Sequence, residues 1–268
     1  MAKNTEVVTT DNEYDLPADF MAELAGVSGL GYSEKAEDTL IPILGIIQDN
    51  SAELKRKHEK YWEGAVGGDL IIRSLQKKFA GESEDGHGGV LFQPCGFTHN
   101  WVEWQGEPGD GVPVNQYDFE HRPDGCREEP DPENPDRIRL VMPNGNRLVD
   151  TRNHFGHILD GETLIPVVVP MAGTNHTVSR QWTALMKNKR MPSGRKCHSF
   201  FFWYTLKTAF TQRGAQSWYK YSVKEEGPIT DEVTLRAGLA MLKSLENHEI
   251  TPDVASGSES TVNDSPID

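Results

Sequence analysis

Short apolar runs separated by Gly, Pro and Asn dominate the chain, mostly after residue 69, and predict a mainly β structure. The predicted strands cover 41–47, 70–75, 90–93, 97–104, 138–142, 147–151, 163–171, 199–206 and 217–223. Between two of them, the run Pro-Asn-Gly-Asn from Pro143 to Asn146 predicts a hairpin turn, because Asn-Gly tolerates positive φ.

Helical spacing of apolar residues is rarer. Helices are predicted over 52–62, with Ser51 as the N-cap, and over 180–189, with Ser179 as the N-cap. The clearest is 230–247, where Thr230 can cap and acids follow at the positive end of the helix dipole. One stripe of this helix is apolar and consists of Leu235, Leu239, Leu242 and Leu245.

These elements predict a mainly β fold with a few helices (α+β), and specifically an OB-like five-stranded barrel with insertions and disordered acidic termini. Residues 1–35 are expected to form an acidic, mostly disordered arm, and 36–247 the OB-like DNA-binding domain. That domain includes an acidic Pro- and Gly-rich insertion at 105–136 and the C-terminal helix 230–247. Residues 248–268 are a Ser-, Gly- and acid-rich tail that cannot bury apolar surface.

The net charge of the 268 residues is −14, which by itself argues against nucleic-acid binding, since carboxylates and phosphates repel. The charge is unevenly distributed. Residues 1–40 carry −7, residues 244–268 carry −6 and residues 103–136 carry −9, so the remainder of the chain carries +8. The sequence therefore describes a basic body with three acidic appendages.

Residues 163–224 contain no Asp or Glu and ten Lys or Arg, and ten aromatic residues fall within 180–224. Single-stranded nucleic acid calls for this combination, because cations follow the phosphates and aromatic faces stack on bases of any sequence. A packed core of aromatics under a solubilising basic surface is the alternative explanation. The loop 187–196 favours binding, since five of its ten residues are Lys or Arg.

The candidate nucleic-acid-binding residues are the bases and aromatics of this segment, with two earlier tryptophans as secondary candidates. They are Arg180, Trp182, Lys187, Lys189, Arg190, Arg195, Lys196, Trp203, Tyr204, Trp218 and Tyr219, followed by Trp101 and Trp104. Side chains alternate along a strand, so only about half of the strand aromatics can face a ligand. The sequence does not say which half.

Signals for catalysis or cofactors are weak. Cys95, His99, His121 and Cys126 could enclose a zinc ion, but their spacing matches no compact zinc module, and separate thiols and surface histidines are the favoured interpretation. His154 and His157 are expected on opposite faces of a strand. We find no P-loop, dinucleotide fingerprint, nucleophile elbow or H-E-x-x-H motif, and we expect no enzyme activity and no cofactor. No apolar run is long enough to span a bilayer, so no membrane partner is expected.

Several short motifs resemble those of the single-stranded-DNA-binding proteins of tailed bacteriophages. The similar segments lie within about residues 36–225 and are 41–48 (IPILGIIQ), 51–53 (SAE), 67–69 (GGD), 101–104 (WVEW) and 179–182 (SRQW), followed by the acidic tail. The resemblance implies an OB-like fold, a role in phage replication or recombination, and a tail that recruits partner proteins. Such tails often end in an aromatic residue, whereas this one ends in Ser-Pro-Ile-Asp at Asp268.

The sequence thus predicts a sequence-tolerant, non-enzymatic single-stranded-DNA-binding protein of phage replication or recombination, acting in the host cell cytoplasm. Phage replication or recombination proteins are candidate partners through the acidic tail, and a homo-oligomer remains open. One alternative is a phage structural or protein-interaction module without DNA binding. A nuclease or metal-dependent enzyme using His154, His157, Asp150 or Asp160 is a less favoured alternative.

Overall fold

The computed structural model describes residues 40–81, 88–106, 112–131, 134–191, 194–214, 216–247 and 251–252. The predicted N-terminal arm, 1–35, and most of the predicted tail, 248–268, lie outside the described residues. Of that tail, Thr251–Pro252 forms strand β13, which pairs in parallel with β1, Leu40–Ile41.

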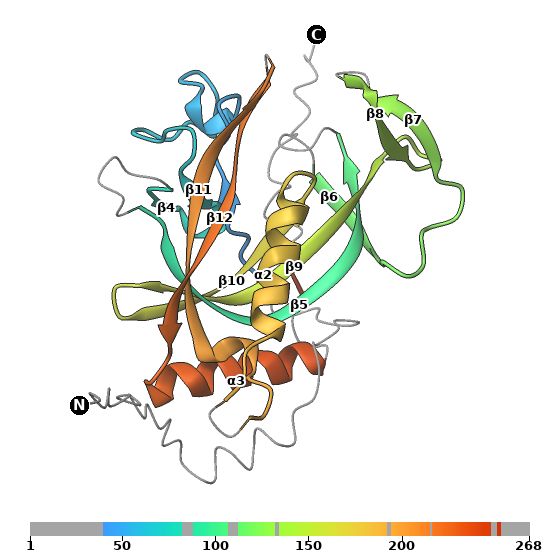
Figure 1. The fold of residues 1–268 in the computed structure, drawn as a ribbon. Coiled ribbons are helices and arrows are strands. Elements are labelled where there is room, and N and C mark those ends of the chain that lie inside the picture. The colour runs from blue at the N-terminus through green and yellow to red at the C-terminus, as the bar shows by residue number, and fades with distance from the viewer. Residues whose placement is uncertain are drawn as a thin grey trace, which may run out of the picture.

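The fold is mainly β, with two α-helices and three short 3-10 turns among the described residues (Figure 1). The helices are α2, Asn175–Lys187, and α3, Glu232–Glu246. The 3-10 turns are η1, Ala52–Leu54; η2, Arg73–Leu75; and η3, Ser199–Phe201. The other strands are β2, Gly45–Ile46; β3, Leu70–Ile72; β4, Lys77–Phe79; β5, Val90–Gln105; β6, Val112–Asp118; β7, Arg127–Asp131; β8, Asn134–Val141; β9, Arg147–Asp160; β10, Thr163–Ala172; β11, Phe202–Arg213; and β12, Gln216–Pro228.

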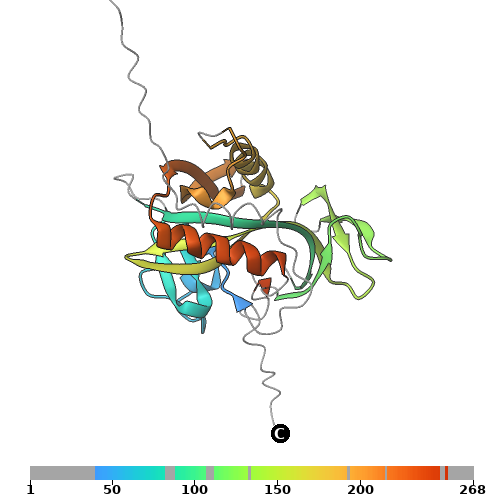
Figure 2. The ribbon, with the colours of Figure 1, turned by 90° about the horizontal axis from the view of Figure 1, so that it is seen from below.

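The main sheet has eight strands in the order β12-β11-β5-β9-β8-β7, with β10 also pairing β9 and β6 also pairing β5. Each of these pairings is antiparallel. The sheet is strongly curved, and β6, β7 and β8 extend from the body at the end far from the β11–β12 hairpin (Figures 1 and 2). We call these three strands and their connections the arm.

The sheet buries side chains on both faces, because consecutive strand residues point to opposite sides. One face packs under α3 and includes Cys95, Phe155 and Val168. The other face packs against α2 and the small β2-β3-β4 sheet, and includes Phe92 and Ile158. Figure 2 shows α3 lying across β5 and β9. The long strands β5, β9 and β10 are therefore apolar on both faces where the two cores overlap.

Helix α3 forms where the leucine stripe predicts it, and all four leucines are buried. Its N-cap is Asp231 rather than Thr230, since the Asp231 carboxylate accepts from the Thr234 backbone N–H at 2.8 Å. Buried Gln93 ties the helix to the sheet by donating from Nε2 to the carbonyls of Thr234 (2.9 Å) and Phe200 (3.0 Å).

Residues 42–48 extend the sheet beyond β10. Leu44 N donates to Val168 O and Val168 N donates to Pro42 O, both at 2.9 Å, so the segment runs alongside β10 as a parallel neighbour. It leads directly toward β12, the strand at the opposite edge of the curve.

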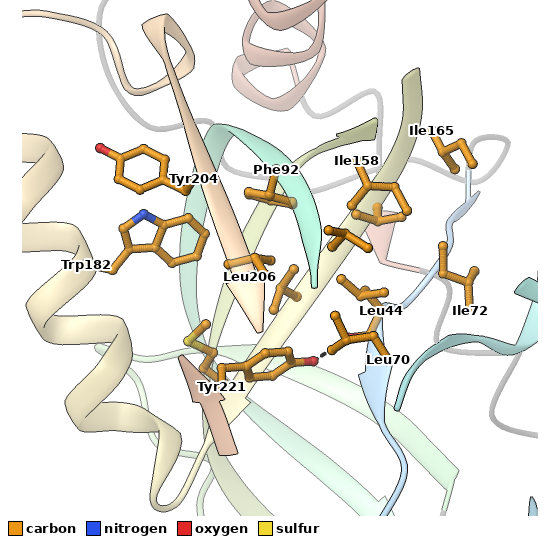
Figure 3. Packing of buried hydrophobic residues seen from close by; sticks show 14 residues of the cluster. Leu44, Leu70, Ile72, Phe92, Ile158, Ile165, Trp182, Tyr204, Leu206 and Tyr221 are labelled. Carbon is orange, nitrogen blue, oxygen red and sulfur yellow. Dashed lines mark hydrogen bonds between the residues drawn. The ribbon is translucent and has the colours of Figure 1, made fainter. Parts of the chain in front are cut away.

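The side chain of Gln48 completes this connection. Its Nε2 donates to Tyr219 O at 3.0 Å and its Oε1 accepts from Tyr219 N at 2.8 Å. Nearby, the Tyr221 hydroxyl donates to Leu44 O at 2.6 Å (Figure 3), and Tyr221 N donates to Asn175 Oδ1 at 2.9 Å. Side-chain amides therefore satisfy backbone groups on the edge of β12 that would otherwise be unpaired.

Two local predictions are wrong. The helix over 52–62 is only the turn η1 followed by turns, since the Trp62 N–H donates to Glu53 O (2.9 Å) and closes a loop instead. Ser179 does not cap a helix, because α2 begins at Asn175 and the Ser179 hydroxyl contacts His154 Nε2 at 2.8 Å. In contrast, the hairpin turn at 143–146 is confirmed, with Gly145 at φ 88°.

The mainly β, α+β class is confirmed, whereas a five-stranded barrel is not: the main sheet has eight strands and curls into a half-barrel. The acidic insertion contributes strands β6 and β7 and the start of β8. Among the described residues, neither helix is both long enough and apolar enough to cross a membrane.

One buried carboxylate anchors the base of the arm. Glu103, on β5, is 1 % exposed and accepts four side-chain hydrogen bonds. Asn115 (2.9 Å) and Tyr117 (2.6 Å), both on β6, donate to Oε2, and Asn144 (2.8 Å) and Asn146 (2.6 Å), from the hairpin turn, donate to Oε1. Burial acts to raise the pKa of Glu103, but the four donors outweigh it and lower the pKa to about 2.

Replacing Glu103 with Gln should destabilise the protein by about 3 kcal/mol at pH 7, because the amide cannot accept all four bonds. The stabilisation from a depressed pKa is present above the unfolded value near 4.5 and is lost as the pH falls toward 2. Urea denaturation at pH 7 and at pH 3 should therefore show a smaller difference between the two proteins at pH 3. Glu128→Gln, on an exposed carboxylate of the arm, is the matched control, with an expected change under about 0.5 kcal/mol. An equal effect of the two substitutions would contradict the anchoring role.

Candidate nucleic-acid interface

The acid-free segment 163–224 folds as β10, α2, the loop after it, η3 and most of the β11–β12 hairpin. It does not form one continuous surface. The structure divides the predicted binding residues into buried aromatics, the outer end of the hairpin, the end of α2 with its loop, and two tryptophans near the arm.

Trp182 and Tyr204 are core residues, 2 % and 1 % exposed (Figure 3). The Trp182 ring lies edge-on to Phe92 (5.5 Å between centroids) and to Tyr204 (5.6 Å), and stacks on His154 (4.4 Å). Alternation along β11 and β12 places Tyr204 and Tyr221 on the inward face. This burial removes Trp182 and Tyr204 from the candidate interface, because a stacking ring needs an open face.

Trp218 and Tyr219 lie in the outer half of the hairpin and are both partly exposed. Tyr219 pairs across the strands with Phe210, whose side chain is 51 % exposed, and the two rings meet edge to face at 5.4 Å between centroids. Trp218 points to the opposite face of β12, which is also the face that carries Lys220. Sequence reasoning missed Phe210, since it lies past the end of the predicted strand 199–206, and its position beyond the end of the core exposes it.

Lysines accompany these rings on the hairpin. Lys207, Lys220 and Lys224 lie on the same face as Trp218 and opposite to Phe210 and Tyr219, as the register and the alternation of the two strands require. Lys224 forms an ion pair with Glu226 at 3.0 Å. Asp and Glu are absent from the hairpin until Glu225 and Glu226, at its base. The outer half of the hairpin, residues 207–220, therefore combines aromatic faces with positive charge, and we call it the hairpin end.

The end of α2 and the loop after it form a second basic cluster. Its exposed members are Arg180, Lys187, Arg190, Arg195 and Lys196. The loop folds back on itself, with Met191 N donating to Arg195 O at 2.8 Å.

Two other predicted residues near this cluster are already engaged. Lys189 forms an ion pair with Glu225 (2.5 Å) and lies over the Phe202 ring (4.8 Å). Trp203 is partly buried against the core under α3.

Trp101 and Trp104 lie elsewhere, on the part of β5 that pairs with β6. Trp101 stacks on Phe119 (5.1 Å between centroids), donates from Nε1 to Phe119 O (3.1 Å) and has the Arg122 guanidinium over its ring at 5.5 Å. Trp104 is partly exposed, with its indole nitrogen buried. Strand β11 pairs with β5 only at Val90–Phe92, at the other end of β5, so the structure does not bring the predicted tryptophans together.

The four residues considered for zinc do not converge. Cys95 is buried in the core under α3, which raises its pKa, whereas Cys126 donates to Met142 Sδ at 3.2 Å. His99 pairs with Asp150 at 2.6 Å, and His121 is exposed. Among the residues that the structure describes, no group of three or more metal-ligating side chains is assembled.

The prediction that His154 and His157 point to opposite faces is confirmed. His154 contacts Ser179 on α2, whereas His157 contacts Gln93 Oε1 at 3.0 Å on the α3 side. Burial lowers the pKa of His154 to about 3 and that of His157 to about 4, so both are neutral at pH 7. Both histidines serve packing and hydrogen bonding.

A family model described as Pam3 phage gp34-like protein matches residues 10–251, which is most of the chain. The chain belongs to this bacteriophage protein family. Comparisons with curated proteins and with solved structures return no match.

Trp182→Ala should destabilise the protein by about 3–5 kcal/mol, because it opens a cavity in the core. Phe210→Ala should cost less than about 1 kcal/mol, since half of this side chain is already in water. Urea denaturation followed by circular dichroism measures both. Similar losses for the two variants would show that the division between core and interface aromatics is incorrect.

Proposed function

We propose that this phage protein binds single-stranded DNA without sequence preference, and that the hairpin end is where bases stack. The observation that carries the proposal is the exposed Phe210 beside Tyr219, on a hairpin with no acid in its outer half. Stacking on an aromatic face contributes about 1–3 kcal/mol per base and tolerates any base.

The charge distribution supports the same proposal. In the sheet order, the hairpin lies at one end and strands β7 and β8 of the arm lie at the other. The arm carries exposed acids such as Glu120, Asp124 and Glu128. A polyanion approaching the protein is therefore attracted toward the hairpin side. The cluster at the end of α2, with Lys187 and Arg190, would extend the positive surface along β12.

We also propose an OB-like relationship for the curved sheet. Strands β12, β11, β5, β9 and β10 are successive neighbours, and residues 42–48 connect β10 back to β12. These five strands are the candidate for the predicted five-stranded barrel. The role we propose in the host cell is passive protection of DNA during phage replication or recombination.

Titration with a dT oligomer of about 20 nucleotides should quench tryptophan fluorescence, with Trp218, the neighbour of Tyr219 on β12, as the expected reporter. The logarithm of the affinity should fall linearly with the logarithm of salt concentration, by about 0.7 per phosphate contacted. Phe210→Ala should weaken binding about 5- to 150-fold. Val233→Ala, a change at an exposed apolar residue on α3, should leave the affinity unchanged.

The same titration separates the alternatives. A structural or interaction module would leave the fluorescence unchanged at every salt concentration and would form large particles in light scattering. A nuclease would shorten the oligomer on a denaturing gel, whereas a passive binder returns it intact.

Truncation after Pro252 should tighten oligonucleotide binding, because it removes Asp253, Glu259, Asp264 and Asp268 but keeps β13. An acidic tail competes with phosphates for a cationic surface. The titration, repeated at low and high salt, should show the gain mainly at low salt. Unchanged affinity would reject competition by the tail and would leave a role in partner recruitment as the remaining proposal for it.

A further inference from the structure

Residues 55–62 form an exposed cationic loop that the sequence predicted to be part of a helix. Its sequence is KRKHEKYW, with Lys55, Arg56, Lys57 and Lys60 exposed and Tyr61 37 % exposed. We call it the basic loop. It contains four cations and a single acid, Glu59.

Backbone hydrogen bonds give the basic loop a defined shape. His58 N donates to Lys55 O (2.8 Å), Tyr61 N donates to His58 O (2.9 Å), and Trp62 N donates to Glu53 O (2.9 Å). At the base, the buried carboxylate of Glu53 accepts from Arg73 Nε at 2.5 Å. The Lys60 charge interacts with that of Glu53, whereas the side chains of Lys55, Arg56 and Lys57 are not among these closing contacts and lie at the surface.

The chain on either side of the basic loop packs on the hairpin end. Before the loop, Gln48 bonds to both backbone groups of Tyr219. After it, Gly67 and Gly68 lie next to the Tyr219 ring, where an added Cβ would come within 2.9 Å and 2.8 Å of ring carbons. Figure 1 shows this blue segment beside the tip of the β11–β12 hairpin. Two segments about 160 residues apart thus present cations and aromatic rings at one end of the molecule.

From this juxtaposition we propose that the basic loop is a second binding element of the same site, which holds the phosphates of the strand whose bases stack on Phe210 and Tyr219. The inference rests on the proposed function. It divides the work between the two elements, with stacking on the hairpin end and charge neutralisation on the basic loop. Lysine and arginine suit this role because each phosphate they neutralise releases condensed counterions.

The test combines neutralisation of the loop with the salt dependence of binding. In Lys55→Gln/Arg56→Gln/Lys57→Gln, the slope of log affinity against log salt should decrease in magnitude by about 2, since three contacts of about 0.7 each are removed. The quenching at saturation should stay as in the wild type, because the stacking rings are intact. The charge-preserving variant Lys55→Arg/Arg56→Lys/Lys57→Arg should keep the wild-type slope.

Arg127→Gln/Arg236→Gln/Lys243→Gln is the matched control. It removes three positive charges, as the loop variant does, but from the arm and from α3. This control should change the slope by less than about 0.7, the value for one phosphate contact. Circular dichroism should report wild-type secondary structure for every variant. If the wild type binds dT and the neutralised variant has the same slope, the basic loop is not a second binding element, and the proposed stacking site is unaffected. A wild type that does not bind would reject both proposals.

Discussion

The pairing of Gln48 with Tyr219 is the contact on which the arrangement of the structure depends. A primary amide has the same donor and acceptor as a peptide group, so one side chain satisfies the N–H and the C=O of an edge strand as a neighbouring strand would. Each bond contributes only about 1 kcal/mol net, but an unpaired edge would be open to pairing with other chains. The same contact connects residues 42–48, which pair with β10, to the edge of β12.

The inward face of the β11–β12 hairpin is buried near its base and exposed farther out, because the core ends part-way along the strands. Near its base, the inward face of β11 and β12 closes the core with Tyr204, Leu206 and Tyr221. Farther out, the core ends, and the same alternation carries Phe210 and Tyr219 past it. The proposed interface therefore lies where β11 and β12 extend past the end of the hydrophobic core.

The arm is anchored by a buried, hydrogen-bonded carboxylate. Glu103 is nearly inaccessible and yet charged, which is tolerated because four donors from two elements surround it. Three of these donors are asparagines, whose neutral amides hydrogen-bond to the carboxylate without adding positive charge to the arm. The arm thus stays acidic on its surface and is attached to the sheet at the end away from the basic hairpin.

The sequence by itself determined the β-rich class, the helix with its leucine stripe, the hairpin turn at 143–146 and the opposed orientation of His154 and His157. These depend on periods of two and 3.6 residues and on turn chemistry, which are local. It also showed that the charge is segregated along the chain. It could not show that Trp182 and Tyr204 are buried while Trp218 is partly exposed, because helical spacing and strand alternation describe buried and exposed segments equally well.

Only the tertiary structure decided which aromatics stay accessible, that residues 52–62 form a loop rather than a helix, and that the segments on either side of this loop pack on the hairpin. The physical reason is that contacts such as those of Gln48, Gly67 and Gly68 with Tyr219 join residues more than 150 positions apart. Their energies come from packing and hydrogen bonding across the fold, and no period along the chain encodes such pairs.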